Sequence, residues 1–580
     1  MKKLLRYMKN YIKECIFAPL FKMIEAGFEL IVPLVIAAII DNGIADKNLG
    51  YIGKMCVILV VLGVVGLVIS ITAQYFSAKA AVGFAAEVRH SLFTHIQSLS
   101  YTELDTLGSS TLITRITSDV NQVQNGVNLT LRLLLRSPFV VFGAMVMAFT
   151  INGRISLIFL VTIAALSIAV FGIMIVTIPL YRDVQGKLDG VTELTRENLT
   201  GVRVLRAFCM EKHESQEFSR RNRALTDMQK FVGRISAVMN PLTYVLVNLA
   251  IVWLIYSGAI HVNEGSITQG EVVALYNYMA QILTELVKLA NLIISITKAV
   301  ACGNRIQSVF ETESGEQNES NIAASDENIL SENDLNGGNE YAVEFNHVGL
   351  TYKGAGDCSL HDIDFKVKKG ETVGIIGGTG SGKTSLVNLI PAFYPATEGQ
   401  IAVDGRDVRD YDVDELRAKI GVVPQKAALF SGTIRENLLW GNENAGDDRL
   451  NAALETAQAA EIVRNKENGL DYILEQNGGN LSGGQKQRLT IARALVRQPE
   501  ILILDDSASA LDMATDAKLR KALKKLDNTT TFIVSQRASG VKNADKIIVL
   551  DDGKIAGIGT HDKLLESCGI YKEIWDSQNS

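Results

Sequence analysis

The sequence predicts an α-helical membrane domain of six spans, with long helical extensions on its cytoplasmic side, followed by an α/β domain. Three observations predict this fold. Hydrophobic residues make up 47% of the 580-residue chain, which is high for a wholly soluble protein. All apolar stretches long enough to cross a bilayer lie before residue 300. From Tyr341 onward, short apolar strands alternate with glycine turns and helices.

Six apolar stretches, of about 20 residues each, can cross a membrane as helices. The long segments that separate them, 77–132 and 181–237, are predicted to be helical, because apolar residues recur at intervals of three and four and prolines are few. Helices that continue past the bilayer can reach a soluble domain and transmit its movement. The predicted spans are residues 16–40, 55–76, 133–151, 155–180, 238–261 and 272–299.

The distribution of basic residues predicts the orientation of the spans. Lys and Arg are concentrated in the N-terminal tail and in segment 181–237, whereas the loop 261–271 has none. Because basic loops stay on the cytoplasmic side, both termini and both long segments are predicted to be cytoplasmic. The N-terminus is interpreted as retained, not as a cleaved signal, since the following apolar run carries Lys22, Glu25 and Glu29.

Charged residues inside the predicted spans have two interpretations. Lys22, Glu25 and Glu29 share one helical face, since they lie at i, i+3 and i+7. Either they form a stripe that faces a solute, or Lys22 and Glu25 pair near the membrane surface while Glu29 turns into the bundle. Glu285 and Lys288 in the sixth span have the i, i+3 spacing and the same two interpretations. Neither group identifies a solute.

Residues 311–340 are predicted to be a flexible acidic linker between a membrane domain, 1–310, and a soluble domain, 341–580. The linker holds nine acidic residues and no Lys or Arg. These acids account for the net charge of −6, and no continuous basic stripe suited to nucleic acid is present in the sequence. The six cysteines have neither metal-ligand spacing nor a paired pattern, so we expect them to be reduced.

The sequence TVGIIGGTGSGKTSLVNLI predicts a phosphate-binding loop between a strand and a helix. Its glycines allow backbone N–H groups to wrap phosphates, so ATP is the predicted ligand. Lys383 would meet the outer phosphates, and Thr384 would bind Mg²⁺ together with Asp505, the last residue of the apolar strand ILILD. The loop residues expected to bind the nucleotide are Gly377, Gly378, Thr379, Gly380, Ser381, Gly382, Lys383, Thr384 and Ser385.

The phosphate loop, the strand ILILD and the sequence LSGGQ at 481–485 together resemble the ATP-binding cassette (ABC) transporters. Six spans followed by one cassette is similar to the exporter half-transporters of that family, so the resemblance covers the whole chain. It implies an α/β P-loop ABC nucleotide-binding domain in which Tyr352 stacks on adenine. Gln425 would be a metal-binding residue in the loop that senses magnesium and contacts the membrane half.

The same resemblance implies that two chains build each nucleotide site. Ser482 and Gly484 of LSGGQ, with Asp512, would complete the site on the other cassette of a dimer. Ser482 is also expected to cap the helix that follows it, because Ser is a favoured N-cap residue. Coupling helices would lie within residues 101–119 and 197–211.

Two residues depart from the family pattern. The resemblance implies a Glu after the strand's last Asp, as general base, and a His at the end of the later strand FIVSQ, where this chain has Asp506 and Gln536. Asp is one methylene shorter than Glu, and a misplacement of ~1 Å can lower the rate on the order of a hundredfold. Gln cannot become cationic as His can. The segment ILEQNGGN before LSGGQ also departs from the expected pattern of acidic and basic residues.

These departures favour a heterodimeric exporter of amphiphilic drugs, lipids or peptides. This chain's own site would hydrolyse ATP slowly, while its LSGGQ serves a non-identical half-transporter that carries Glu and His. Abundant Lys, Asn and Ile suit a bacterial plasma membrane, with the lipid bilayer as the surrounding partner and no nucleic acid partner. Two alternatives remain: a homodimeric exporter that uses Asp506 as base, and a non-pumping, ATP-gated membrane assembly.

Overall fold

The computed structural model describes residues 3–312, 340–526 and 528–579. They divide into two compact units, Met1–Ile96 with Ser110–Glu311, and Gln97–Ser109 with Thr312–Ser580. Apart from its ends, the predicted acidic linker 311–340 lies outside the described residues. The short segment Gln97–Ser109 therefore belongs to the second unit, although it lies between two membrane helices in the sequence.

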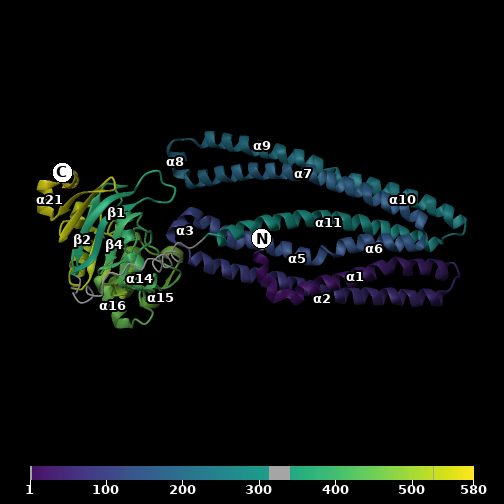
Figure 1. Cartoon of the computed structure of the whole chain (residues 1–580), viewed down its shortest axis with the longest axis horizontal. Helices are drawn as coiled ribbons and strands as arrows, with labels where there is room; N and C mark the ends of the chain where they lie inside the picture. The colour runs from purple at the N-terminus through teal and green to yellow at the C-terminus, as the bar shows by residue number, and fades with distance from the viewer. Residues whose placement is uncertain (1–2, 313–339, 527, 580) are drawn as a thin grey trace. The chain divides into compact units, whose positions relative to one another are not determined.

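Among the described residues, six helical segments are long and apolar enough to cross a membrane, and each contains one predicted span. In Figure 1 they follow one another as long helices joined by short connections. The main helices are α1 (Ile12–Ala38), α2 (Leu49–Gln97), α5 (Val120–Leu133), α6 (Arg136–Ile151), α7 (Gly153–Thr200), α9 (Glu211–Ala237), α10 (Met239–Asn263) and α11 (Gln269–Phe310).

The predicted helical extensions are confirmed. α2 continues unbroken to Gln97 and α7 to Thr200, where short α8 (Val202–Ala207) leads into α9. Local sequence signals explain where two of these helices begin. The Asn152 side chain accepts hydrogen bonds from the backbone of Arg154 and Ile155 at the start of α7. Thr268 and Glu271 form a capping box at the start of α11.

The core of the first unit lies where α1, α6, α7, α10 and α11 meet. Its largest fully buried side chains include Phe159 and Tyr278. The Tyr278 hydroxyl donates a hydrogen bond to the carbonyl of Leu30 at 2.7 Å. This bond joins α11 to α1 and satisfies a polar group that is otherwise costly to bury.

The second unit is built on two large sheets, with a small two-stranded sheet of β7 (Gly432–Thr433) and β8 (Ile473–Leu474). The six-stranded sheet has the order β12-β11-β3-β10-β9-β6, and the four-stranded antiparallel sheet has the order β2-β1-β4-β5. In the first sheet, strands β11, β3, β10, β9 and β6 run parallel to one another. The strands are β1 (Tyr341–Leu350), β2 (Leu360–Lys368), β3 (Thr372–Gly377), β4 (Glu398–Val403), β5 (Arg406–Asp407), β6 (Ile420–Val423), β9 (Ile501–Asp505), β10 (Thr530–Val534), β11 (Lys546–Asp551) and β12 (Lys554–Gly559).

Helices surround these sheets in two groups. α13 (Lys383–Leu389) packs with β3, β9 and β10 and shares their apolar core. A second core joins α15 (Ile434–Leu439), α16 (Asp447–Thr456) and α18 (Gly483–Val496). α19 (Met513–Leu523) also contributes to this second core, through its buried leucines. The short helix α3 (Tyr101–Leu107) belongs to the same unit as these elements.

Candidate functional site

Four neighbouring parallel strands bring the predicted nucleotide-binding residues to one edge of the sheet. The register pairs Ile375 of β3 with Val534 of β10, and Val534 with Asp505 of β9. The phosphate loop follows β3, and Asp506 follows β9. Gln425 and Gln536 lie two residues beyond the ends of β6 and β10. Since carboxyl ends of parallel strands form the ligand-binding edge of such sheets, residues far apart in the sequence meet here.

The phosphate loop has the backbone that its glycines allow. Gly382 has φ +90° and immediately precedes α13, as a left-handed residue that a side chain would strain. A Cβ on Gly377 would lie 2.1 Å from the carbonyl oxygen of Leu550, so only glycine fits there. Gly378, Thr379 and Gly380 are exposed and accessible to a nucleotide, whereas Ser381 is buried and Ser385 half-buried.

Lys383 lies within this loop and is buried. Its ammonium donates to the carbonyl oxygens of Gly377 at 3.0 Å and Gly378 at 2.5 Å, and to the Ser381 hydroxyl at 3.2 Å. Burial lowers the pKa of Lys383, while the nearby carboxylates of Asp506 and Asp505 act in the opposite direction. A cation held among loop oxygens is suited to meeting an anionic phosphate.

Thr384 and Asp505 form the predicted metal-binding pair. The Thr384 hydroxyl lies 3.1 and 3.0 Å from the two carboxylate oxygens of Asp505. A hydroxyl and a carboxylate are the hard oxygen ligands that Mg²⁺ prefers, with phosphate oxygens and water completing its shell, so these residues fit the ion. Burial raises the pKa of Asp505, and a bound cation would reverse that effect by favouring the ionised form.

Asp506 occupies the position after β9 with φ +42°, a left-handed conformation that Asp tolerates better than most residues. Its N–H donates to the carbonyl of Val534 at 3.1 Å. Its carboxylate lies 3.4 Å from the side-chain nitrogen of Gln425, so the structure places these two predicted residues side by side. Burial raises the pKa of Asp506.

Gln536 is exposed, and its backbone carbonyl accepts a hydrogen bond from the Gln578 side chain at 2.8 Å. The interpretation that the strand FIVSQ ends in Gln536 was two residues too long, because β10 ends at Val534. The physical reason is a local turn: the Ser535 hydroxyl accepts a hydrogen bond from the Arg537 N–H at 3.0 Å. Gln536 is therefore a loop residue at the same sheet edge as Asp506.

Tyr352, the predicted adenine-stacking residue, is connected to α3 through a residue that sequence reasoning missed. The Tyr352 hydroxyl donates to Ser385 at 3.0 Å, and its ring meets the ring of Tyr394 edge-on at 5.0 Å between centroids. The Tyr394 hydroxyl donates to a carboxylate oxygen of Asp105 at 2.6 Å. α3, which lies in a predicted coupling segment, thus contacts Tyr394, whose ring packs against the residue predicted to stack on adenine.

The LSGGQ residues lie at the start of α18. The Ser482 hydroxyl accepts a hydrogen bond from the Gln485 N–H at 3.4 Å, and the Gln485 side chain accepts one from the Ser482 N–H at 3.0 Å. Ser482 therefore caps this helix, and the predicted cap is confirmed. A Cβ on Gly484 would lie 3.0 Å from the carbonyl of Ala510, so this helix start packs on the segment before Asp512. Within the described part of the chain, no hydrogen bond joins Ser482 or Gly484 to the phosphate loop.

Asp512 has a local role that the sequence did not suggest. Its carboxylate caps α19 by accepting from the N–H of Thr515 at 2.9 Å and from the Thr515 hydroxyl at 2.8 Å. These hydrogen bonds hold the pKa of Asp512 below its usual value. Ser482 and Asp512 therefore mark the starts of two helices, α18 and α19.

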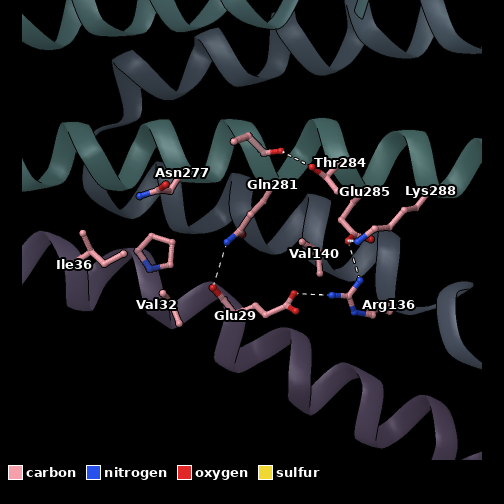
Figure 2. A pocket seen from close by; sticks show the side chains of 12 residues that line it. Glu29, Val32, Ile36, Arg136, Val140, Asn277, Gln281, Thr284, Glu285 and Lys288 are labelled. Carbon is pink, nitrogen blue, oxygen red and sulfur yellow. Dashed lines mark hydrogen bonds and ion pairs between the residues drawn. The ribbon is translucent and has the colours of Figure 1, made fainter. Parts of the chain in front are cut away.

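The charged residues of the membrane helices pair with one another (Figure 2). Lys22 contacts Glu25 at 2.5 Å and the Ser70 hydroxyl at 3.0 Å, so the pairing predicted for these two residues is present. Glu29 pairs with Arg136 at 2.6 Å across α1 and α6. Sequence analysis missed Arg136, although a single arginine inside the predicted span 133–151 was a usable signal.

Comparisons with known proteins agree with this architecture. A family model described as ABC transporter transmembrane region matches residues 15–286, and one described as ABC transporter matches residues 360–509. The ABC transporter ATP-binding protein YfiB of Bacillus subtilis is 37% identical over 578 residues, which cover 100% of this chain and 98% of the relative. YgaD of the same organism, described as a multidrug export ATP-binding/permease protein, is 30% identical over 590 residues, 100% of this chain and 99% of the relative.

A relative in Mycobacterium tuberculosis, the ABC transporter ATP-binding protein Rv1273c, is 35% identical over 581 residues, 99% of this chain and 97% of the relative. Among solved structures, a bacterial Atm1-family ABC exporter with ATP bound has a TM-score of 0.78 at 22% identity, covering 100% of this chain and 99% of that chain. At this identity the structural likeness concerns the fold alone.

Proposed function

The chain belongs to the ABC transporter family, as a multi-pass exporter with a transmembrane and an ATP-binding domain, and on this premise we propose that it is one subunit of a heterodimer. Its own ATP site hydrolyses slowly. Its LSGGQ segment completes the active site of a second, non-identical half-transporter that carries Glu and His at the positions of Asp506 and Gln536. The assembled pair moves amphiphilic solutes out of the cell by alternating access.

One observation carries this proposal: the residues expected to bind nucleotide and cation are all present, whereas the two residues expected beside the reacting phosphate, Asp506 and Gln536, differ from the family pattern. Lys383 lies among the oxygens of its own loop, and the Thr384 hydroxyl lies beside the Asp505 carboxylate, an arrangement that supports their holding a nucleotide with its cation. Mg²⁺, when bound, neutralises charge on the phosphate oxygens. Asp506 offers a carboxylate on a shorter side chain, and Gln536 offers a hydrogen bond but no positive charge. A site of this kind binds ATP well and positions the attacking water poorly.

The geometry of LSGGQ supports its service to another chain. Ser482 occupies the N-cap of α18, whose first N–H groups can contact an anion. α18 packs in the second core of the unit, apart from the core that contains β3 and α13. In the proposed heterodimer, the start of α18 meets a phosphate held by the phosphate loop of the partner.

Cargo and orientation complete the proposal. The relative YgaD carries a multidrug-export description, which supports amphiphilic drugs, lipids or peptides as cargo for this chain. The basic residues of the N-terminal tail and of segment 181–237 support cytoplasmic termini in a bacterial plasma membrane.

The test begins with purification of the tagged chain from its own membrane and identification of the co-purified half-transporter by mass spectrometry. We expect a different chain, with Glu and His at the two changed positions and an altered LSGGQ. Inverted vesicles containing the pair should accumulate rhodamine B or ethidium in the presence of ATP. Recovery of only this chain in a complex that hydrolyses ATP would refute the heterodimer, and a partner with an intact LSGGQ would refute the asymmetric assignment.

A further inference from the structure

A row of four alternating charges connects α1, α6 and α11 in the membrane unit (Figure 2). Glu29 pairs with Arg136 at 2.6 Å, Arg136 with Glu285 at 2.8 Å, and Glu285 with Lys288 at 2.8 Å. Ser137 donates a further hydrogen bond to Glu285 at 2.8 Å. We name this row, Glu29–Arg136–Glu285–Lys288, the charge row. It carries no net charge.

The inner and outer members of the charge row differ sharply in exposure. The side chains of Arg136 and Glu285 are 8% and 4% exposed, whereas those of Glu29 and Lys288 are each 44% exposed. Burying two charges is costly unless they pair, and the inner two satisfy each other. The row therefore presents one accessible carboxylate at one end and one accessible ammonium at the other.

Both ends of the charge row line the same cavity, of about 390 Å³. This volume lies in the usual range for small-molecule sites, roughly 300–1,000 Å³. Figure 2 shows the charged side chains of Arg136 and Lys288 toward one end of the cavity, and Ile36 and Asn277 toward the other. The apolar part of the wall is completed by Val32, Pro33, Val140 and Ala280.

Two buried polar atoms of the cavity wall have no hydrogen-bond partner within the described residues. They are the Nε of Arg136 and the side-chain oxygen of Gln281. Gln281 directs its side-chain nitrogen to the carbonyl of Glu29 at 3.4 Å, which orients it along the wall. Unsatisfied buried polar groups are uncommon in folded proteins and are a feature of sites that bind ligands or water.

We propose that this cavity binds a zwitterionic amphiphile, with an ammonium group beside Glu29 and a carboxylate or phosphate beside Lys288. The inference rests on the proposed exporter function, whose cargo class it narrows. A ligand with a single charge would pair with one end of the row and leave the other unmatched, whereas a zwitterion pairs with both. The apolar part of the zwitterionic ligand lies against Val32 and Ile36. Free-ended peptides and zwitterionic lipid headgroups share this chemistry.

The test measures binding without ATP, so that its failure is distinct from a failure of transport. The complex purified from its own membrane is placed in lipid nanodiscs and dialysed to equilibrium against radiolabelled Leu-Phe-Leu tripeptide. Four forms are compared: free at both ends, N-acetylated, C-amidated, and blocked at both ends. We expect the free form to bind about tenfold or more tightly than either singly blocked form, as the loss of one charge-assisted hydrogen bond implies.

Two variants assign each charge to its partner. Glu29→Gln should abolish the preference for the free tripeptide over the N-acetylated form. Lys288→Gln should abolish the preference for the free tripeptide over the C-amidated form. Each change leaves the buried pair of Arg136 and Glu285 intact, so the fold is retained. Glu264→Gln, which removes an exposed acid outside the cavity, should preserve both preferences. A merely structural role for the charge row would not produce this matching of variant to ligand end.

A second arm distinguishes the two sources of zwitterion. Dihexanoylphosphatidylcholine and dihexanoylphosphatidylglycerol are compared in the same assay, with the wild type and the three variants above. Preference for the choline lipid without peptide binding assigns the cavity to lipid headgroups. Binding of the free tripeptide without preference for the choline lipid assigns it to peptides. The proposal would be overturned if the free and blocked tripeptides bound equally well, or if neither the tripeptide nor the choline lipid bound. It would also be overturned if the preferences for the free tripeptide survived in both Glu29→Gln and Lys288→Gln. ATP-driven dye transport in the same complex reports separately on the exporter function.

Discussion

Replacing Asp506 by Asn tests whether this carboxylate performs the chemistry of ATP hydrolysis. The substitution keeps the size of the side chain and its contact with Gln425, 3.4 Å away, but removes the ability to accept a proton. In the proposed heterodimer we expect almost no change in ATP turnover, because the partner's site performs nearly all of it.

The magnitude follows from the geometry at the end of β9. The carboxylate of Asp506 is one methylene shorter than that of Glu, and a displacement of about 1 Å slows such a step by about a hundredfold. The site of this chain then supplies about 1% of the turnover of the pair, so removing its base lowers the total by an amount within experimental error. If Asp506 were the working base in both sites of a homodimer, its loss would lower turnover by about 10²–10⁴-fold.

The assay is steady-state phosphate release at saturating Mg-ATP, on the complex purified from its own membrane. Asp562→Asn is the matched control, since it removes an exposed carboxylate from the same unit without touching the site. Nucleotide binding, measured by filter retention, should be unchanged in both variants. A tenfold or larger loss of turnover in Asp506→Asn alone would refute the assignment of a slow site.

Ser482→Ala removes a helix cap worth about 1 kcal/mol, so Tm should fall by only a few degrees while turnover of the complex falls by most of its value; unchanged turnover would exclude a role in the partner's site. Tyr394→Phe keeps the ring beside Tyr352 but removes the hydrogen bond to Asp105. ATP binding should therefore persist, while the stimulation of ATP turnover by rhodamine B is reduced. Stimulation equal to that of the wild type would contradict coupling through the Tyr394–Asp105 contact. Because burial raises the pKa of Asp505 above its ordinary value of 3.8, its contribution to stability is complete below that value and is lost as pH rises through the folded pKa. Asp505→Asn should therefore raise the Tm of the nucleotide-free protein at pH 7 and flatten its pH dependence, while abolishing Mg-dependent ATP binding; a lower Tm at pH 7 would contradict the sign.

The residues of the phosphate site could be predicted because their signal is local. The run from Gly377 to Thr384 specifies its own turn, and the apolar strand before Asp505 specifies a buried parallel strand. The helix cap at Ser482 is likewise a pattern of four consecutive residues. Such features depend on neighbours in the sequence, so the folded structure has the predicted strand, glycine loop and helix around Lys383 and the predicted cap at Ser482.

Contacts between distant segments could not be predicted in this way. Arg136 and Glu285 are separated by 149 positions, and Asp105 and Tyr394 by 289, and no periodicity connects them. Each of these contacts depends on which helix faces which neighbour.

The amino-acid sequence by itself determined the six spans, the parallel strands and the phosphate loop, because hydrophobic period and glycine placement act over a few residues. The two changed residues, Asp506 and Gln536, stand out only against the pattern of the family that the chain resembles. Only the tertiary structure decided that Gln425 lies beside Asp506, that Tyr394 connects Tyr352 to α3, and that four charges from three helices form one row beside a cavity. The physical reason is that burying a charge or a hydroxyl requires a partner, and packing alone determines which partner is within reach.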